Sequence, residues 1–429
     1  MIQTPQLAKD WSVSEATLPA IYYAGRQGYA MRHKETFIPL TSEAQVKQHL
    51  IQNGHERETL NSTLCQIRTL NYVAHIGPVA GHKVGVYTSP DSGKKYLVTE
   101  SPKIITGVAG DCPFIENFIF ELFGEIEQAE AALAWLRQAR RNVVNQQRRP
   151  LPAAVLVGAR KCGKTLFFEI ARLAIGGRSA PALRALTGAT NFNASTLGAE
   201  LLLVDDEIAA RDYRTRTAFA QGIKKHLFAT AVEFEGKNRD SITMRPVHAV
   251  GVAVNNEPEH LEVLPTIDDS MTDKLSLFLC QQAGLSGLSD RDAIMRQIVI
   301  ELPAFLYSLD NTDHPERLRD SRTGVAAWQN PAVLDILRNI SPEEALRELL
   351  VQCEIITTAI EHHGKWDGTA NDIEIALLAQ DSTQNATRRL IKHNTACGTY
   401  LGRLRSAGRI SVEDRIVRGI THWTIRSLS

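Results

Sequence analysis

The sequence predicts an α/β protein of several domains, organised around one segment that joins a buried strand, a glycine-containing loop and a helix. The apolar run at residues 153–157 precedes the loop at 158–165, and a helical pattern follows at 166–173. A second apolar run ends in three carboxylates about 40 residues after the loop. The length of 429 residues predicts roughly three domains at about 150 residues each.

The overall composition is that of a soluble globular protein, with 43% hydrophobic and 22% charged residues and a formal net charge of zero. The six cysteines lie far apart and form no pattern typical of a zinc site, so we expect reduced and mostly packed thiols. The N-terminal residues lack a signal-peptide pattern, and no run reaches the roughly 18 apolar residues of a membrane span. These observations predict a cytoplasmic protein without membrane partners.

The glycine-containing loop has the residues that a triphosphate and Mg²⁺ require. Gly158 and Gly163 permit backbone angles that turn successive amides towards an anion, while Lys164 can reach the outer phosphates and Thr165 can hold the metal. We therefore predict ATP and Mg²⁺ as cofactors. The predicted nucleotide-binding residues are Gly158, Ala159, Arg160, Lys161, Cys162, Gly163, Lys164 and Thr165. The alternative is a glycine turn beside a surface lysine.

The second apolar run, at residues 198–207, ends in Asp205, Asp206 and Glu207. We expect this strand to end beside the loop, where Asp205 and Asp206 would join Thr165 as metal ligands. Either Asp206 or Glu207 would act as general base, and the sequence leaves that register open. A strand that leads into an acidic helix start would show the same pattern.

A third apolar strand, at residues 247–254, ends at Asn255. An amide at the tip of a strand next to the acidic one can orient the attacking water and sense the γ-phosphate, although Asn255 also fits an ordinary turn. Between the second and third strands, residues 214–228 predict a basic helix, and residues 233–240 predict a strand, a tight loop and the start of another strand.

The ordered segments GARKCGKT, LLLVDDE, FEGKNRDSITMRP and VAVNNEP resemble the superfamily 3 helicases of the AAA+ class. The resemblance is closest to primase-helicase-like replication proteins of phages and mobile elements, and it is strong from about residue 151 to 283. It implies an AAA+ phosphate-loop ATPase core, with Lys164, Asp206, Glu207 and Asn255 in catalysis. It also implies a homo-oligomeric, hexameric ring that acts on single-stranded and forked DNA, with a replication primase or initiator as a further partner.

The same resemblance assigns Lys237, Asn238 and Arg239 to the hairpin that grips single-stranded DNA in the ring channel. A lysine and an arginine at a loop tip can contact phosphates without reading sequence, as can a solvated charged turn that has no such role. The family also needs a cation from the neighbouring subunit at each ATP site. The candidates are Arg211, Arg214, Arg216, Arg239 and Lys274, with Arg214 and Arg216 preferred.

Five segments are predicted along the chain. Residues 1–110 form a small α+β module with a capped helix at 42–52 and a hairpin between 84 and 101. Residues 111–150 form a helical collar, with one helix from 115 to 144, and a linker. The ATPase core spans 151–284, and a helical bundle or lid spans 285–368 with helices at 291–302, 331–340 and 342–363.

The last segment, residues 369–429, predicts a winged-helix domain from three helical patterns followed by two strands. From residue 385 onwards there are nine basic and two acidic residues, which leaves a charge of +7 there and −7 in the remainder. Such asymmetry favours contact with a phosphate backbone. The candidate DNA contacts are Arg403 and Arg405 on the last helix and Arg415 and Arg418 on the wing. A module that serves only for packing is the alternative.

Three functions follow from these features. The first is an ATP-dependent DNA helicase that translocates on single-stranded DNA during replication of a phage or mobile element. The second is a replication initiator that binds an origin and uses ATP only to set its oligomeric state. The third is a phosphate-loop ATPase that remodels proteins and does not respond to DNA.

Overall fold

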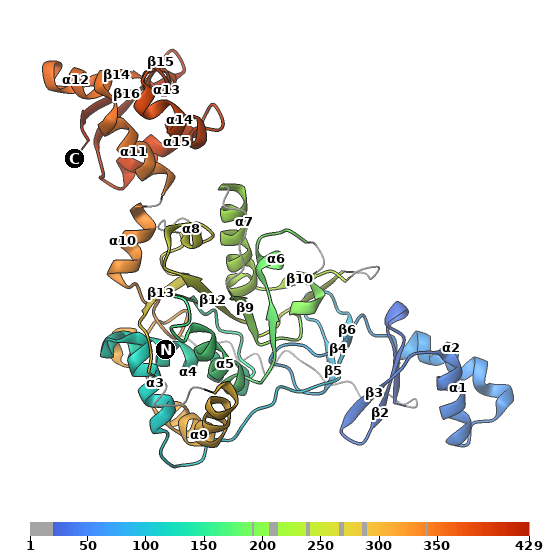
Figure 1. The fold of residues 1–429 in the computed structure, drawn as a ribbon. Helices are drawn as coiled ribbons and strands as arrows, with labels where there is room; N and C mark the ends of the chain where they lie inside the picture. The colour runs from blue at the N-terminus through green and yellow to red at the C-terminus, as the bar shows by residue number, and fades with distance from the viewer. Residues whose placement is uncertain are drawn as a thin grey trace. The chain divides into compact units, whose positions relative to one another are not determined.

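The computed structural model describes residues 20–190, 193–205, 213–236, 241–265, 270–284, 290–339 and 341–428, except the side chains of residues 213, 214, 258, 259, 338 and 339. The chain divides into two compact units, the first ending at Val333 and the second beginning at Leu334 (Figure 1). Each unit is described by itself. None of the helices in the described ranges is both long and apolar enough to cross a bilayer.

The first unit is built on a sheet of five parallel strands in the order β13-β7-β12-β9-β8. The strands are β7 (Ala153–Gly158), β8 (Ser179–Pro181), β9 (Leu201–Asp205), β12 (Ala249–Asn255) and β13 (Leu275–Cys280). Every residue of β7 and β12 is buried, which explains why their sequences are apolar without alternation. Strand β12 lies between the loop strand β7 and the acidic strand β9.

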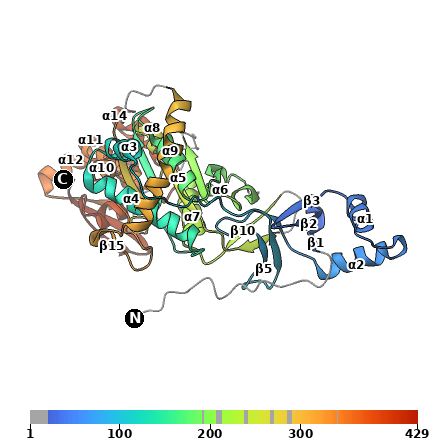
Figure 2. The same ribbon diagram turned by 90° about the horizontal axis from the view of Figure 1, so that it is seen from below.

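Four helices pack against one another and against this sheet (Figure 2). They are α3 (Pro113–Phe123), α4 (Ile126–Val144), α5 (Lys164–Ala174) and α9 (Arg291–Asn311). The prediction of a single helix from 115 to 144 is wrong, because the chain breaks at Gly124 with φ of 69°. A Cβ on Gly124 would approach the Gln281 amide nitrogen to 2.2 Å, so only glycine lets the chain turn beside the end of β13.

Further helices belong wholly or partly to the first unit. They are α6 (Leu183–Leu186), α7 (Tyr213–Ile223), α8 (Pro258–Leu261) and α10 (Pro331–Asn339), the last of which runs across the boundary between the units. The basic helix predicted at 214–228 consists of α7 and a π-helical turn over Lys224–Phe228. Helix α9 packs in the first unit, whereas the helices after residue 341 belong to the second, so the segment predicted at 285–368 is shared between the units.

The N-terminal part forms two small sheets and two helices. One sheet contains β1 (Ile21–Tyr23), β2 (Tyr29–His33) and β3 (Thr36–Leu40), and the other contains β4 (Ile76–Gly77), β5 (Gly85–Thr88) and β6 (Lys95–Val98). Helices α1 (Glu43–Gln52) and α2 (Leu60–Leu70) cover one face of the first sheet. The predicted cap is confirmed, since the Ser42 hydroxyl accepts a hydrogen bond from the Gln45 amide. The predicted hairpin is also confirmed, as β5 and β6 pair antiparallel.

A buried ion pair joins the N-terminal part to the central sheet. The Glu200 side chain, immediately before β9, is completely buried and pairs with the Arg178 guanidinium. Its Oε1 also accepts a hydrogen bond of 3.0 Å from the Gly81 amide, and Arg178 donates to the Glu100 carbonyl at 3.0 Å. Segments separated by up to 119 residues in sequence are therefore held by one carboxylate.

The strands β10 (Val232–Phe234) and β11 (Ile242–Met244) pair antiparallel, which confirms the two predicted strands, and the predicted loop at 237–240 lies outside the described residues. The base of the hairpin packs on Val79 and Tyr96 of the N-terminal part. Two buried histidines, His226 and His248, contact Phe234, with ring centroids 6.2 and 6.1 Å from that of Phe234. Burial lowers the pKa of His226 to about 4 and lowers that of His248 well below its usual value.

Acid is therefore expected to destabilise the first unit. Both histidines are neutral when folded, whereas in the unfolded chain they titrate near pH 6.5. Their contribution to stability is complete above about pH 6.5 and is lost as the pH falls towards 4, by on the order of 3 kcal/mol for His226. Urea unfolding between pH 7 and 4 should show a shallower pH dependence in His226→Phe than in the wild type. The exposed control His33→Phe should follow the wild-type profile, and an unchanged slope in His226→Phe would contradict the assignment.

The second unit contains α11 (Pro342–Gln352), α12 (Glu354–His363), α13 (Ala370–Leu378), α14 (Asp381–Leu390) and α15 (Ala396–Ser406). Its antiparallel sheet has the order β14-β16-β15, with β14 (Trp366–Thr369), β15 (Ser411–Val417) and β16 (Ile420–Ser427). The three helices and two strands predicted after residue 369 are confirmed. The single helix predicted at 342–363 is wrong, because the buried Cys353 adopts an extended conformation between α11 and α12. Strand β14 was not predicted.

Candidate nucleotide-binding site

The loop between β7 and α5 has the backbone geometry of an anion site. Lys161 and Gly163 have φ of 64° and 123°, which reverses the chain before α5 begins at Lys164. In the described part of the chain, the amides of Arg160, Lys161 and Gly163 have no hydrogen-bond acceptor. Amides left open at the start of a helix are the donors that a phosphate group requires.

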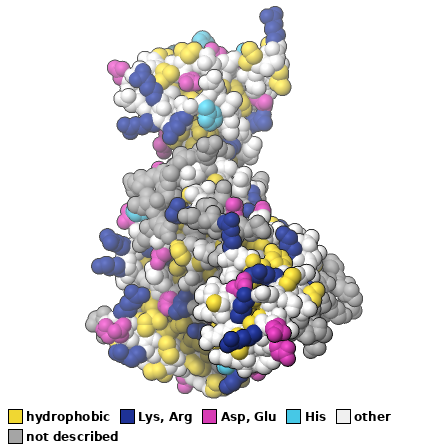
Figure 3. All heavy atoms as spheres, turned by 90° about the vertical axis from the view of Figure 1, so that its right-hand side faces the viewer, with side chains coloured by type: hydrophobic (Ala, Val, Ile, Leu, Met, Phe, Trp, Pro, Cys, Tyr) yellow, Lys and Arg dark blue, Asp and Glu magenta, His cyan; other side chains and the backbone are white. Residues whose placement is uncertain are grey.

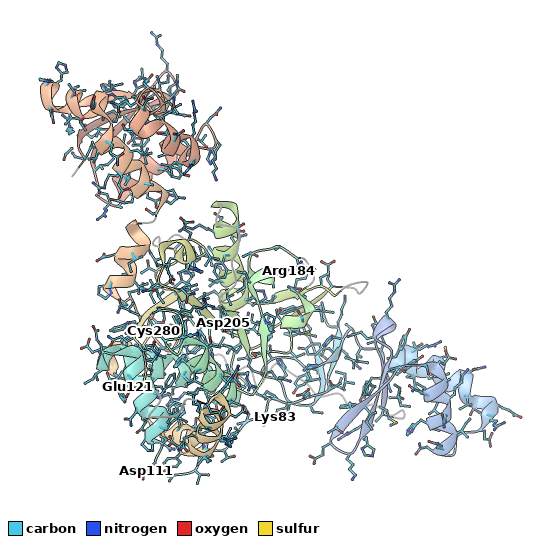
Figure 4. All side chains as sticks on the ribbon, viewed as in Figure 1. Lys83, Asp111, Glu121, Arg184, Asp205 and Cys280 are labelled. Carbon is cyan, nitrogen blue, oxygen red and sulfur yellow. The ribbon has the colours of Figure 1, made fainter. Side chains whose placement is uncertain are left out.

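Gly158 is required by close packing, since its φ does not lie in the left-handed region that favours glycine. A Cβ at this position would lie 2.6 Å from the Cys280 carbonyl oxygen and 3.0 Å from the Cys162 sulfur. Both distances are shorter than a Cβ can tolerate, so no larger residue fits where β7 meets the end of β13. The register of the sheet places Cys280 opposite Gly158, and the labelled Cys280 in Figure 4 marks this end of β13.

The Lys164 ammonium lies at the centre of the site. It is buried, and it donates to the carbonyl oxygens of Gly158 and Ala159, each at 2.9 Å. Its third partner is the Asn255 Oδ1 atom, at 3.0 Å. All three partners are neutral oxygens, which a negatively charged phosphate can replace as ligands of the ammonium.

The order of the sheet explains why Lys164 and Asn255 meet. Strand β12 pairs with β7 so that Asn255 lies opposite Gly158, and it pairs with β9 so that Ala253 lies opposite Asp205. Asn255 therefore projects from the strand between the loop and the acidic strand. The expectation that this amide stands beside the acidic strand is confirmed, while its contact with Lys164 was not predicted.

Thr165 and Asp205 form the second contact across the site. The Thr165 hydroxyl donates to Asp205 Oδ1 at 3.3 Å, although the two residues are 40 positions apart in sequence. Asp205 ends β9 and is labelled in Figure 4. A hydroxyl and a carboxylate oxygen are the ligands that Mg²⁺ prefers, so these residues fit the metal that the sequence predicts.

Several predicted site residues lie outside the described part of the chain. These are Asp206, Glu207, Arg211, Lys237, Asn238 and Arg239, together with the side chain of Arg214. Arg216 is described, and it is buried with its Nε donating to the Leu264 carbonyl at 2.9 Å. Lys274 pairs with Asp273 and lies 5.2 Å from the centre of the Phe228 ring. The contacts of Arg216 favour a packing role within its own subunit.

A pair of cysteines beside the loop was missed by the sequence analysis. Cys162 and Cys280 are both buried, and the Lys164 ammonium lies 3.9 Å from the Cys162 sulfur. A hydrogen bond from Cys280 and the nearby Lys164 charge lower the pKa of the Cys162 thiol to about 6, while burial raises that of Cys280. The two residues are too far apart in sequence for any spacing pattern to have linked them.

The basic tail is largely neutralised within its own unit. From Leu334 to Leu428 the chain has twelve basic and twelve acidic residues, because acids before residue 385 balance the arginines after it. Among the candidate DNA contacts, Arg403 pairs with Glu343 at 3.5 Å, Arg405 pairs with Asp414, and Arg415 pairs with Asp367 at 2.8 Å. On the face of this unit in Figure 3, basic, acidic and apolar side chains are interspersed. The charge of +7 in the sequence therefore does not survive as a uniform basic surface.

Part of the sequence matches a known protein family, and the fold is similar to that of a solved structure. Residues 156–271 match a protein family described as a family of unknown function, DUF5906. No curated protein matches the sequence. The fold is that of the C-terminal region of NrS-1 (residues 305–718), whose apo structure is 12% identical with a TM-score of 0.57 over 95% of this chain and 96% of that one.

Two further solved structures are similar at a lower level. One is the SCCmec type IV Cch active helicase, at 9% identity and a TM-score of 0.34 over 92% of this chain and 73% of the other. The second is the JCV helicase, at 12% identity and a TM-score of 0.27 over 53% of this chain and 66% of the other.

Proposed function

We propose that this protein is an ATP-dependent DNA helicase of the superfamily 3 type that acts in the replication of a phage or mobile element. The observation that carries the proposal is the site in which Lys164 meets Asn255 while Thr165 meets Asp205. A lysine, a hydroxyl, a carboxylate and an amide that converge on a phosphate-type loop are the groups needed for phosphoryl transfer to water.

In this proposal each residue has a defined task at the ATP site. The open amides of the loop and the Lys164 ammonium bind the phosphates, with the ammonium leaving the carbonyls of Gly158 and Ala159. Thr165, Asp205 and Asp206 would hold Mg²⁺, which would offset the charge on the phosphate oxygens when bound. Asp206 or Glu207 accepts the proton of the attacking water, and the Asn255 amide orients that water.

The DNA-binding part of the proposal rests on the β10–β11 hairpin and the second unit. Lys237, Asn238 and Arg239 connect β10 to β11, and the base of that hairpin is buried on the N-terminal part, which gives it a firm support. In a ring, such hairpins would contact the phosphates of single-stranded DNA. The second unit has the element order of a winged helix, and it would bind duplex DNA next to the ring. Arg214, Arg211 or Lys274 would serve the neighbouring ATP site.

The first test is ATP turnover with and without single-stranded DNA, together with unwinding of a forked duplex. We expect DNA to stimulate turnover several-fold. Lys237→Ala should lose unwinding but keep most of its ATPase activity, because the hairpin contacts DNA and not the nucleotide. The control Lys95→Ala changes an exposed lysine on β6 and should unwind like the wild type. If Lys237→Ala unwinds as well as the wild type, the hairpin assignment fails.

The element order of the second unit also fits the alternative of a replication initiator that binds an origin. Footprinting on DNA from the protein's own replicon separates the two functions. A protected site without translocation would favour the initiator. Turnover that does not respond to DNA at all would instead favour the remodelling ATPase.

A further inference from the structure

The turn that joins β15 to β16 carries three large aliphatic side chains in solvent. Ile416 is 74% exposed, Ile420 is 57% exposed and Val417 is 40% exposed. We call residues 416–420 the apolar tip. Single exposed aliphatic residues are common on proteins, but three that meet at the end of one hairpin mark a contact surface.

The aliphatic side chains of the apolar tip lie on both faces of the hairpin. Ile416 is opposite Thr421 and continues the face that carries the buried Val412 and Trp423. Val417 and Ile420 face each other across the turn, on the opposite side of the ribbon. A patch made for a flat protein surface would lie on one face, whereas apolar groups on both faces form a wedge.

The turn and the strand register fix the position of this wedge at the end of the hairpin. Arg418 and Gly419 have φ of 52° and 81°, so two left-handed residues close the turn, a geometry that matches the twist of paired strands. The register continues without interruption from Val412 to the closing pair of Val417 and Ile420. The tip is therefore an extension of the sheet, with no loop of its own.

The charge around the wedge favours a polyanion as its partner. Arg418 stands at the turn itself and is exposed, and it meets no carboxylate within the described ranges. The Arg415 side chain, next to Ile416, is 61% exposed even though it pairs with Asp367. Between Arg415 and His422 the sequence contains no acid, in a unit whose charges otherwise cancel.

We propose that the apolar tip enters the minor groove of duplex DNA and inserts Ile416 and Ile420 against the bases, partly unstacking one base step. The minor groove is about 6 Å wide, about half the width of the major groove that admits a helix, and strands of β-sheet proteins can enter it. Aliphatic wedges flanked by arginines open base steps and bend the duplex away from the minor groove. Arg418 would then contact the phosphates or the acceptor edges that line this groove. The inference rests on the proposed function, since it gives the second unit a duplex to act on.

The experiment uses the full chain and a 30-base-pair duplex that contains 2-aminopurine and carries fluorophores at its ends for energy transfer. Wild-type binding should raise the 2-aminopurine fluorescence and shorten the end-to-end distance. The double variant Ile416→Ser with Ile420→Ser should bind at least about tenfold more weakly and produce neither signal. Arg418→Ala should weaken binding with a smaller salt dependence. Ile416→Val with Ile420→Val keeps the apolar wedge and should retain both signals.

The matched control is Ile375→Ser, because Ile375 on α13 is 58% exposed in the same unit and lies outside the tip. It should behave as the wild type, and the thermal melts of all variants should coincide. The inference is overturned if the serine variant binds and unstacks the duplex like the wild type. It is also overturned if the tip variants lose binding to phosphatidylglycerol vesicles and not to DNA. Because the assay needs no ATP, DNA-stimulated turnover that persists without any unstacking would reject the tip alone and leave the proposed function standing.

Discussion

Lys164→Ala is expected to lower ATP turnover by about a hundredfold or more, with little effect on folding. The buried Lys164 ammonium holds a positive charge at the phosphate-type loop. Removing one preorganised hydrogen-bond donor from a comparable site lowers kcat by about two to three orders of magnitude. The same ammonium binds the phosphates in the proposed complex, so nucleotide binding should weaken as well. Phosphate release at saturating ATP and equilibrium binding of a fluorescent ATP analogue would measure the two effects separately.

The matched control for this variant is Lys94→Ala, which removes an exposed lysine from the β5–β6 turn and should leave turnover unchanged.

Asn255→Ala removes the other partner of the contact between Lys164 and Asn255. It should lower turnover while it preserves most of the nucleotide affinity, because the amide acts on the attacking water and the ammonium acts on the phosphates. Turnover in Lys164→Ala within a few-fold of the wild type would show that the hydrolytic site lies elsewhere.

Glu200→Ala is expected to destabilise the first unit by about 3–5 kcal/mol. The side chain is completely buried, and its loss leaves the Arg178 guanidinium, at 14% exposure, without its carboxylate. The Gly81 amide also loses its acceptor. Because the same carboxylate holds the N-terminal part against the central sheet, that part should also become more susceptible to proteolysis. Urea unfolding followed by tryptophan fluorescence would measure the change.

A more exposed ion pair serves as the control for the buried pair of Glu200 and Arg178. Glu169 and Arg172 on α5 form an ion pair of the same chemistry, but their side chains are 30% and 27% exposed. Glu169→Ala should therefore cost no more than about 1 kcal/mol, since water solvates both groups when the pair is broken. If the two variants are destabilised equally, burial is not the source of the effect at Glu200.

Many elements could be predicted because their signals are local. The apolar run before Gly158 and the capping residue Ser42 act on their own neighbours in sequence, so the pattern and the structure coincide there. The errors arose where a distant contact overrode the pattern. The helical periodicity ends at Gly124, where the Gln281 amide donates to the Leu122 carbonyl at 2.7 Å, and Cys353 separates α11 from α12 where the chain is buried.

The sequence by itself determined the chemistry available to this protein, since a phosphate-type loop, a row of acids and a strand-end amide are each encoded within a few residues. Only the tertiary structure decided which of these groups meet. It placed β12 between β7 and β9, and so brought Asn255 to Lys164 across 91 residues of sequence. It also set the acids of α11 and β14 against the arginines of the basic tail. The order of parallel strands and the pairing of distant charges depend on packing between segments remote in sequence, and such packing has no local pattern to reveal it.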